Sequence, residues 1–468
     1  MFDIGNLRRF ATLGLAFAAC LATGCGGGAG SSAVMRTSVA KTQIKIGDAP
    51  ADSVLAFALT VTRVDLMQQG GTPVNVLNTS EEVELTHLSG TVESLAVANV
   101  GAGTYTGAAI TVSNVEVSYL PSGSTSPVEK KFALNTTINV AFNPAITISN
   151  QPTVLNFDLN VAQSLTFDAA GNVTAVNPVF TASTAMVAAQ GEQEEETGKV
   201  EDMVGVVSMV TPASGNTPAS FALTPDSGGT DQTFTVDANT KFEDGLTQFS
   251  DLKTGMLVKV DATTQTDGSL LATDVEMKEA TNGLEADGVI TATTGNPVTS
   301  LTLLVQDEAG NMATNMVGTP LTVDVSNAAF KSPLNDADLS SLLQGLPFTP
   351  KFDNTTVATG QRVEVNGAAD GQTTASFSAN KVTLRQQALT GTVGAPGTGS
   401  NASFSLLLDA DSAFANLTKV SSLNVYEVSK TQLKDISSVT QGTKVRVRGL
   451  LLFDGTTYQF VAARITQP

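Results

Sequence analysis

Apolar and polar residues alternate along most of the chain beyond residue 42, in short runs separated by turn residues. Phe57, Leu59 and Val61 occupy every second position of one such run. Residues spaced in this way share one face of a β-strand. Helical spacing is nearly absent, and Asn160–Leu165 is the one weak helix candidate of the first half. The pattern predicts an all-β protein.

The first part of this pattern predicts a β-sandwich over residues 42–188. Turn residues recur about every 8–15 positions, as in domains built from short antiparallel strands. We expect a turn at Gly47–Pro50 and hairpin loops at Gly70-Gly71 and at 168–172. The expected strands are 44–46, 57–66, 74–77, 82–85, 108–119, 137–142, 154–159 and 173–175.

The remainder of the chain repeats one pattern three times. Each copy opens with a glycine before β-formers, continues with Gly-x-x-Val-x-Val or a close variant, and then has an Asp-Gly pair. Asp-Gly favours the tight turn of a β-hairpin, because glycine accepts positive φ. The opening glycines are 205, 288 and 391, the central motifs are 255–260, 360–365 and 442–447, and the Asp-Gly pairs are 267–268, 370–371 and 454–455.

These copies predict three small β-barrel-like modules, arranged with the sandwich as beads on a string. We place the repeats at 203–280, 284–387 and 388–468. The middle one contains an insertion at Leu334–Phe352, in which Ala337–Leu343 is a short helix candidate. A run of glutamates without apolar residues predicts a solvated linker at 189–202.

The N-terminus has an arginine pair followed by a short apolar run that ends at Leu21-Ala22-Thr23-Gly24-Cys25. A membrane-spanning helix needs about 20 apolar residues, and this run is shorter. Small residues before a cysteine are typical of a bacterial lipobox, where a peptidase cleaves and the thiol receives diacylglycerol. We therefore expect residues 1–24 to be a lipoprotein signal peptide and Cys25 to be the lipidation site.

The alternative is a secretory peptide that is cleaved without lipidation, since Ala18 and Ala19 precede another cysteine, Cys20. The glycines after Cys25 favour lipidation, because an anchored domain needs a flexible spacer. Residues 25–41 are the expected tether. Cleavage before Cys25 would leave no free thiol and no disulfide in the mature chain.

Composition disfavours two classes of binding partner. The formal net charge is −19, so an acidic surface disfavours nucleic acid as a partner. Tryptophan is absent and there are four tyrosines, at positions 105, 119, 426 and 458. Sugar-binding proteins usually stack their ligand on such rings, so the sequence gives little support to carbohydrate stacking.

No catalytic, cofactor or metal site is predicted. His87 is the only histidine, no nucleophile-elbow motif accompanies it, and we expect it at a strand end, facing solvent or capping a turn. Counts of histidine and cysteine exclude a zinc or copper site. The segments Asp226–Asp231 and Asp307–Asn311 offer carboxylates for Ca²⁺, but neither has EF-hand spacing, so we expect turns there. Asp48 is expected to cap backbone N–H groups in an Asx-Pro turn.

Two segments resemble known families of unknown function. Ile46–Pro50, Val83-Glu84-Leu85, Gly101–Tyr105 and Leu155–Leu159 occur in the order typical of domain of unknown function 4382, and this resemblance covers about residues 42–187. The three repeats are similar to domain of unknown function 5666 over about 203–467. Both families commonly follow lipoprotein signals, and neither resemblance implies an activity or a catalytic residue.

The sequence therefore favours a non-catalytic, lipid-anchored protein of the bacterial cell envelope, located at the outer membrane or cell surface. Its modules would bind or scaffold an envelope protein or polysaccharide, with the membrane contacted through lipid on Cys25. The alternative is an extracytoplasmic hydrolase or a sugar-binding accessory protein. A cleft holding two carboxylates about 5–10 Å apart would favour that alternative.

Overall fold

The computed structural model describes most of the chain beyond residue 38, and Ser38–Pro468 form one compact unit. The described residues are 39–49, 52–77, 79–88, 92–186, 199–225, 231–243, 245–278, 283–310, 316–332, 343–369, 376–396 and 403–467. Several parts of the chain lie outside these residues. They are the expected signal peptide, the tether with Cys25, residues 189–198 of the acidic linker, residues 226–230, the helix candidate 337–343 except its last residue, and the turn at 370–371.

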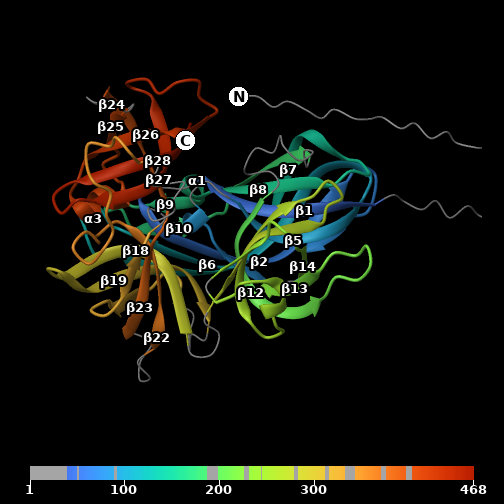
Figure 1. The fold of residues 1–468 in the computed structure, drawn as a ribbon. Helices are drawn as coiled ribbons and strands as arrows, with labels where there is room; N and C mark the ends of the chain where they lie inside the picture. Colours follow the sequence, from blue (N-terminus) through green and yellow to red (C-terminus); the bar gives the residue numbers. More distant parts are fainter. Residues whose placement is uncertain are drawn as a thin grey trace, which may run out of the picture. The chain divides into compact units, whose positions relative to one another are not determined.

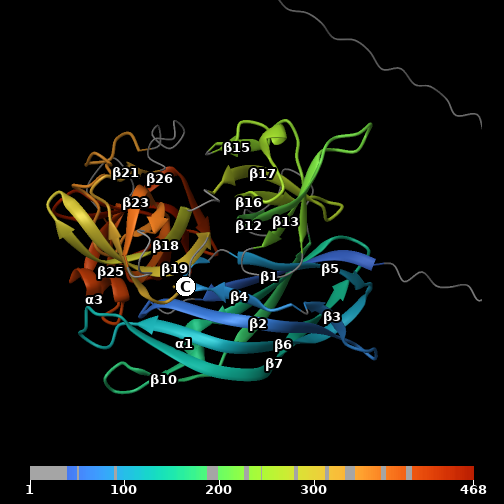
Figure 2. The same ribbon diagram turned by 90° about the horizontal axis from the view of Figure 1, so that it is seen from below.

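The first domain is a β-sandwich, as the alternating pattern predicted. One sheet has the order β11-β8-β1-β5, and the other has the order β3-β2-β6-β7 with β4 paired to β2 (Figures 1 and 2). Both sheets contribute to one apolar core, which includes Ile44, Phe57, Val112 and Phe157. The elements are β1 (Val39–Ala49), β2 (Val54–Gln68), β3 (Val74–Leu77), β4 (Glu81–Glu84), η1 (Thr86–Leu88), β5 (Val92–Gly101), β6 (Gly103–Tyr119), β7 (Val128–Ile148), β8 (Thr153–Asn160), α1 (Val161–Ser164), β9 (Leu165–Phe167), β10 (Val173–Val176) and β11 (Phe180–Met186).

One sequence expectation for this domain was wrong, and one strand was missed. No turn forms at Gly47–Ala49, because β1 continues to Ala49 and the backbone of Asp48 pairs with Leu159 of β8. Strand β5 was not predicted, although it pairs with β1 along nearly its whole length. The hairpin loop at 168–172 is confirmed, since it joins the paired strands β9 and β10.

The first two repeats share one strand order, shifted by six strands. The first has the order β14-β13-β12-β16-β17-β15 with an additional β14–β17 pairing, and the second has the order β20-β19-β18-β22-β23-β21 with β20–β23. Each additional pairing joins strands that are otherwise four places apart, so the sheet closes on itself. The elements are β12 (Lys199–Thr211), β13 (Ser220–Pro225), β14 (Gln232–Thr235), β15 (Lys241–Glu243), η2 (Phe249–Asp251), β16 (Leu257–Thr264), β17 (Leu270–Met277), β18 (Gly283–Gly295), β19 (Val298–Gly310), β20 (Pro320–Asp324), β21 (Ala329–Lys331), β22 (Arg362–Ala369) and β23 (Ser376–Leu384).

The third repeat is a closed barrel with the order β24-β25-β26-β28-β27, drawn in orange to red in Figure 1. Its strand β26 pairs in parallel with β28, as β14 and β15 pair with β17 in the first repeat. The all-β, multi-domain fold class is thus confirmed. The elements are β24 (Gln387–Pro396), β25 (Ser403–Leu408), α3 (Ala413–Thr418), β26 (Ser422–Lys434), β27 (Lys444–Phe453) and β28 (Tyr458–Thr466).

The repeated glycines lie where these barrels require either close strand approach or a positive φ. At the opening glycines 205, 288 and 391, an added Cβ would lie 2.0–2.5 Å from a carbonyl oxygen of the neighbouring strand. At the central glycines 255, 360 and 442, φ lies between 86° and 90°. Only glycine adopts such backbone positions at little cost. The sequence repeat therefore records close strand approach and positive φ.

Candidate functional site

His87, the only histidine of the chain, lies where the first domain meets the second repeat. It belongs to η1, directly after β4, and its side chain is 15 % exposed. The ring Nδ1 lies 3.2 Å from Oε2 of Glu84. The expectation that His87 faces solvent was therefore wrong, although the alternative position in a turn is correct.

The Glu84 carboxylate organises this turn. Oε1 accepts hydrogen bonds from Phe57 N (2.7 Å), Thr86 N (3.0 Å) and Thr86 Oγ1 (2.6 Å). Oε2 accepts one from His87 N at 2.8 Å. Glu84 is 6 % exposed, and a buried carboxylate needs such partners. The turn and the start of β2 are thus held by one side chain.

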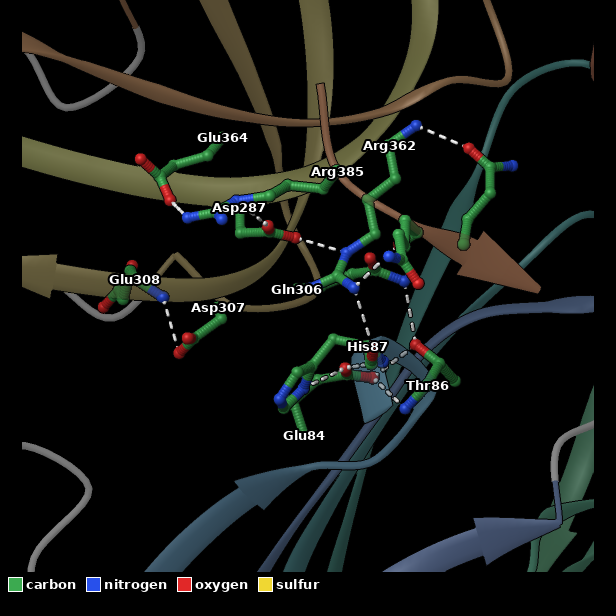
Figure 3. Close-up of polar contacts among 12 residues, drawn as sticks. Glu84, Thr86, His87, Asp287, Gln306, Asp307, Glu308, Arg362, Glu364 and Arg385 are labelled. Atoms are coloured by element: carbon green, nitrogen blue, oxygen red, sulfur yellow. Dashed lines mark hydrogen bonds and ion pairs between the residues drawn. The ribbon is translucent and has the colours of Figure 1, made fainter. Parts of the chain in front are cut away.

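The second repeat contacts the same turn through two side chains (Figure 3). Arg362 Nη1 donates to His87 O at 2.9 Å, while its Nε donates to Asp287 Oδ1 at 2.6 Å. Gln306 Nε2 donates to Leu55 O at 2.7 Å and to Thr86 Oγ1 at 2.9 Å. Strands β18, β19 and β22 therefore each place a polar residue at the junction.

Asp307 also belongs to this junction, on β19. The sequence predicted a turn at Asp307–Asn311, and this was wrong at its start, because residues 307–310 continue the strand. Asp307 pairs in register with Asp287 of β18, and its carboxylate accepts a hydrogen bond from Glu308 N. Figure 3 shows it between Glu308 and the Glu84–His87 pair.

Burial and charge shift two pKa values here. Burial opposes protonation of His87, but the hydrogen bond to Glu84 and the charges of Glu84 and Asp307 outweigh it and raise its pKa to about 9. Burial raises the pKa of Asp307 to about 6, although the positive charge of His87 opposes the rise. At neutral pH the junction therefore contains an imidazolium and ionised Asp307.

Ion pairs continue from this junction toward the first repeat. Arg385 pairs with Glu364 and lies 3.9 Å from Asp287. Lys278, 3 % exposed, lies 2.8 Å from Glu285 and 3.5 Å from both Glu364 and Glu276. Glu276 and Glu364 belong to different repeats. Side chains of the first and second repeats thus form one connected network of ion pairs, and Arg362 links this network to the first domain through the backbone carbonyl of His87.

This arrangement lacks the elements of a nucleophilic site. The hydroxyl of Thr86 in this turn donates to Glu84 and accepts from Gln306. A neighbouring pocket lined by Asp52, Gln306 and Arg446, among others, has a volume of about 90 Å³. Ligand sites usually measure about 300–1,000 Å³. Within the described part of the chain, no three His, Cys, Asp or Glu side chains converge as metal ligands.

The other residues that sequence analysis singled out are dispersed. Asp168 accepts hydrogen bonds from Ala170 N and Asn172 N, as expected of a hairpin loop. Asp231 accepts hydrogen bonds from Ser208 and Thr224. Cys25 lies outside the described residues, and no helix within the described ranges has the length and apolar content that crossing a membrane requires.

None of the four tyrosines offers an open ring face. Tyr105, Tyr119 and Tyr426 are at most 8 % exposed. The ring of Tyr458 packs against Phe414 and Phe453, with centroid distances of 5.2 and 4.8 Å. Sugar stacking on tyrosine, the possibility left open by composition, has no platform at these positions.

A second buried carboxylate, Glu81, predicts a pH effect on stability. Burial, helped by the charge of Glu93, raises its pKa from 4.5 to about 8. The folded state thus holds a proton that the unfolded chain releases above pH 4.5, so the free energy of unfolding falls as pH rises toward 8. Glu81→Gln is expected to raise stability by about 1–3 kcal/mol above pH 8, measured by urea unfolding.

The matched control is Glu82→Gln, one position along β4, whose side chain points to the opposite face of the strand. It is expected to leave the pH dependence of unfolding unchanged. A Glu81→Gln variant that is no more stable than the wild type above pH 8 would contradict the assignment.

Comparisons with known proteins identify two domains. Residues 39–174 match the model of a domain of unknown function (DUF4382), and residues 205–276 match a second domain of unknown function (DUF5666). Their order agrees with the resemblance seen in the sequence. The second match covers the first repeat. No curated protein matches the chain.

One similar solved structure is "drosophila Unr CSD456", which is 10 % identical in sequence. The alignment covers 57 % of this chain and 97 % of that chain, with a TM-score of 0.13. A similarity at this level bears on neither the fold nor the function of the present chain.

Proposed function

We propose that this chain, in which a DUF4382 domain precedes a DUF5666 domain, is a non-catalytic, lipid-anchored protein of the bacterial cell envelope. Its β-modules are displayed for binding or scaffolding, with an envelope protein or polysaccharide as the partner. The lipidated Cys25 of the Leu21–Cys25 motif supplies the anchor. Lipoprotein modification adds two or three acyl chains, and more than one chain is needed for stable attachment.

The observation that carries this proposal is that the ionisable side chains at the junction hold the two domains together. The only histidine and its carboxylate partner hold a turn, and Arg362 and Gln306 bind that turn from the second repeat. Histidine and carboxylate side chains, which hydrolases use as bases and acids, thus join two domains here. A catalytic base must instead reach a substrate proton directly or through one water.

Two further features weigh against the alternative, a hydrolase or sugar-binding accessory protein. The pocket next to the junction measures about 90 Å³, below the range of about 300–1,000 Å³ that is usual for ligand sites. The tyrosine rings are covered by other residues of the chain. Loops at the ends of rigid β-modules remain as binding surfaces, which is where such folds usually bind partners.

A pull-down on intact cells tests the proposal. The tagged full-length chain is cross-linked on living cells and recovered after solubilisation, alongside a tagged chain ending at residue 41. This control carries the same signal, anchor and tether without the modules. We expect an envelope protein or polysaccharide to be enriched with the full-length chain alone.

The opposite results are equally clear. Equal recovery with both chains would contradict display for binding. Release of soluble fragments from envelope polymers by the purified protein, abolished in Asp307→Asn or Asp52→Asn, would establish the hydrolase instead. Those two acids are chosen because burial raises the pKa of each.

A further inference from the structure

We infer that the junction between the first domain and the second repeat is a proton-controlled joint, closed while His87 is protonated and loosened when it loses its proton.

The polar contacts of this joint converge on a short stretch of the first domain. Arg362 and Gln306 donate to the carbonyl oxygens of His87 and Leu55 and to the hydroxyl of Thr86. A small apolar cluster that includes Leu55, Leu120 and Leu304 lies beside them. The position of η1 relative to β19 and β22 therefore sets how the two modules meet.

Charged groups of both modules interact with His87. They are Glu84 on β4, Asp307 on β19 and Arg362 on β22. Arg362 is paired with Asp287 at 2.6 Å. The imidazolium thus interacts with the Glu84 carboxylate of its own domain and with the Asp307 carboxylate of the second repeat.

Loss of the His87 proton changes the sign of the interaction across the joint. Glu84 and Asp307 then oppose each other without the intervening positive charge, and like charges in a poorly solvated site repel strongly. The neutral ring keeps its hydrogen bond to Glu84, so the turn survives while attraction to the second repeat is lost. The joint is therefore expected to loosen without unfolding either module.

The pH range follows from the two groups that titrate. Asp307 is ionised above about pH 6, and the pKa of His87 is about 9. Below the lower value the neutral Asp307 needs no counter-charge, so the joint stays closed. Loosening is thus expected on the alkaline side only, as pH rises through the pKa of His87.

Distance measurement between two spin labels tests the joint in the full chain. Ala133→Cys on β7 and Ala292→Cys on β18 place labels on exposed strand positions of the two modules, with Cys20→Ser and Cys25→Ser removing the native thiols. Glu81→Gln is included because Glu81 titrates in an overlapping range. We expect one narrow distance population near pH 7 and its loss to longer, broader distances near pH 10.

Three variants separate this joint from a general effect of pH. His87→Gln is neutral at all pH values and is expected to show the broad distribution already near pH 7. Asp307→Asn removes the carboxylate that lacks a counter-charge once His87 is neutral. Its distance distribution is expected to stay narrow near pH 10. Asp65→Asn, in the exposed pair with Arg63, is expected to behave as the parent chain.

A parent chain that keeps its narrow distribution near pH 10 would overturn the inference. So would an Asp307→Asn chain that broadens as the parent does, an outcome that remains decisive if His87→Gln fails to fold. Both results leave the proposed envelope function untouched, since that function is judged by the pull-down.

Discussion

Replacing Cys25 with serine is expected to move the protein from the membrane fraction to the soluble fraction. A serine hydroxyl cannot form the thioether to diacylglycerol, so the lipid anchor is not formed. Each buried CH₂ of an acyl chain contributes about 0.8 kcal/mol to membrane attachment, so loss of two or three chains removes the anchor almost entirely. Fractionation after an alkaline wash, with incorporation of labelled fatty acid, measures both steps.

Cys20→Ser is the matched control, because Cys20 lies in the same apolar run but outside the lipobox. It is expected to leave labelling and membrane attachment unchanged. If Cys20→Ser abolished labelling, the lipid would be attached to Cys20 instead. If Cys25→Ser remained in the membrane after the wash, another means of attachment would replace the lipid anchor. Mass spectrometry of the mature N-terminus distinguishes those outcomes.

The fold was largely predictable because local chemistry repeats with the structure. Glycines 205, 288 and 391 recur because a neighbouring carbonyl leaves no space for Cβ, and the alternating valines of β16, β22 and β27 face barrel cores. Each requirement acts within one hairpin, so it leaves a mark at fixed spacing in the sequence. Three similar modules were therefore recognisable without knowledge of their contacts.

The junction was not predictable, because its residues meet only through tertiary structure. Arg362 and His87 are 275 positions apart, and Gln306 and Leu55 are 251 apart. Asp307 resembled a turn residue because acidic residues and glycine surround it, yet strand pairing with β18 overrides that local preference. Pairing with β8 likewise extends β1 through Asp48.

Glu84→Ala is expected to destabilise the first domain by about 3–5 kcal/mol. The substitution removes the acceptor of four hydrogen bonds, from Phe57 N, Thr86 N, Thr86 Oγ1 and His87 N. It also leaves the His87 imidazolium buried without its nearest counter-charge. Unfolding in urea, followed by circular dichroism in the Glu81→Gln background, measures the loss at the transition of the first domain.

The pH dependence of the same experiment identifies the cause. A histidine whose pKa rises from 6.5 to about 9 on folding contributes stability fully below pH 6.5, and this contribution disappears as pH approaches 9. Glu84→Ala removes the group that holds this pKa high, so its stability is expected to vary little over that range. The Glu81→Gln parent chain is expected to lose stability there.

Two controls separate the buried carboxylate from charge in general. Glu84→Gln keeps one acceptor oxygen and is expected to lose less, about 1–3 kcal/mol. Lys131→Met breaks an ion pair with Glu116 in the same domain, but Lys131 is 60 % exposed, so a loss below about 1 kcal/mol is expected. A Glu84→Ala variant that loses no more stability than Lys131→Met would contradict this prediction. The apolar residues around the turn would then hold it in position, and Glu84 would contribute little to the stability of the domain.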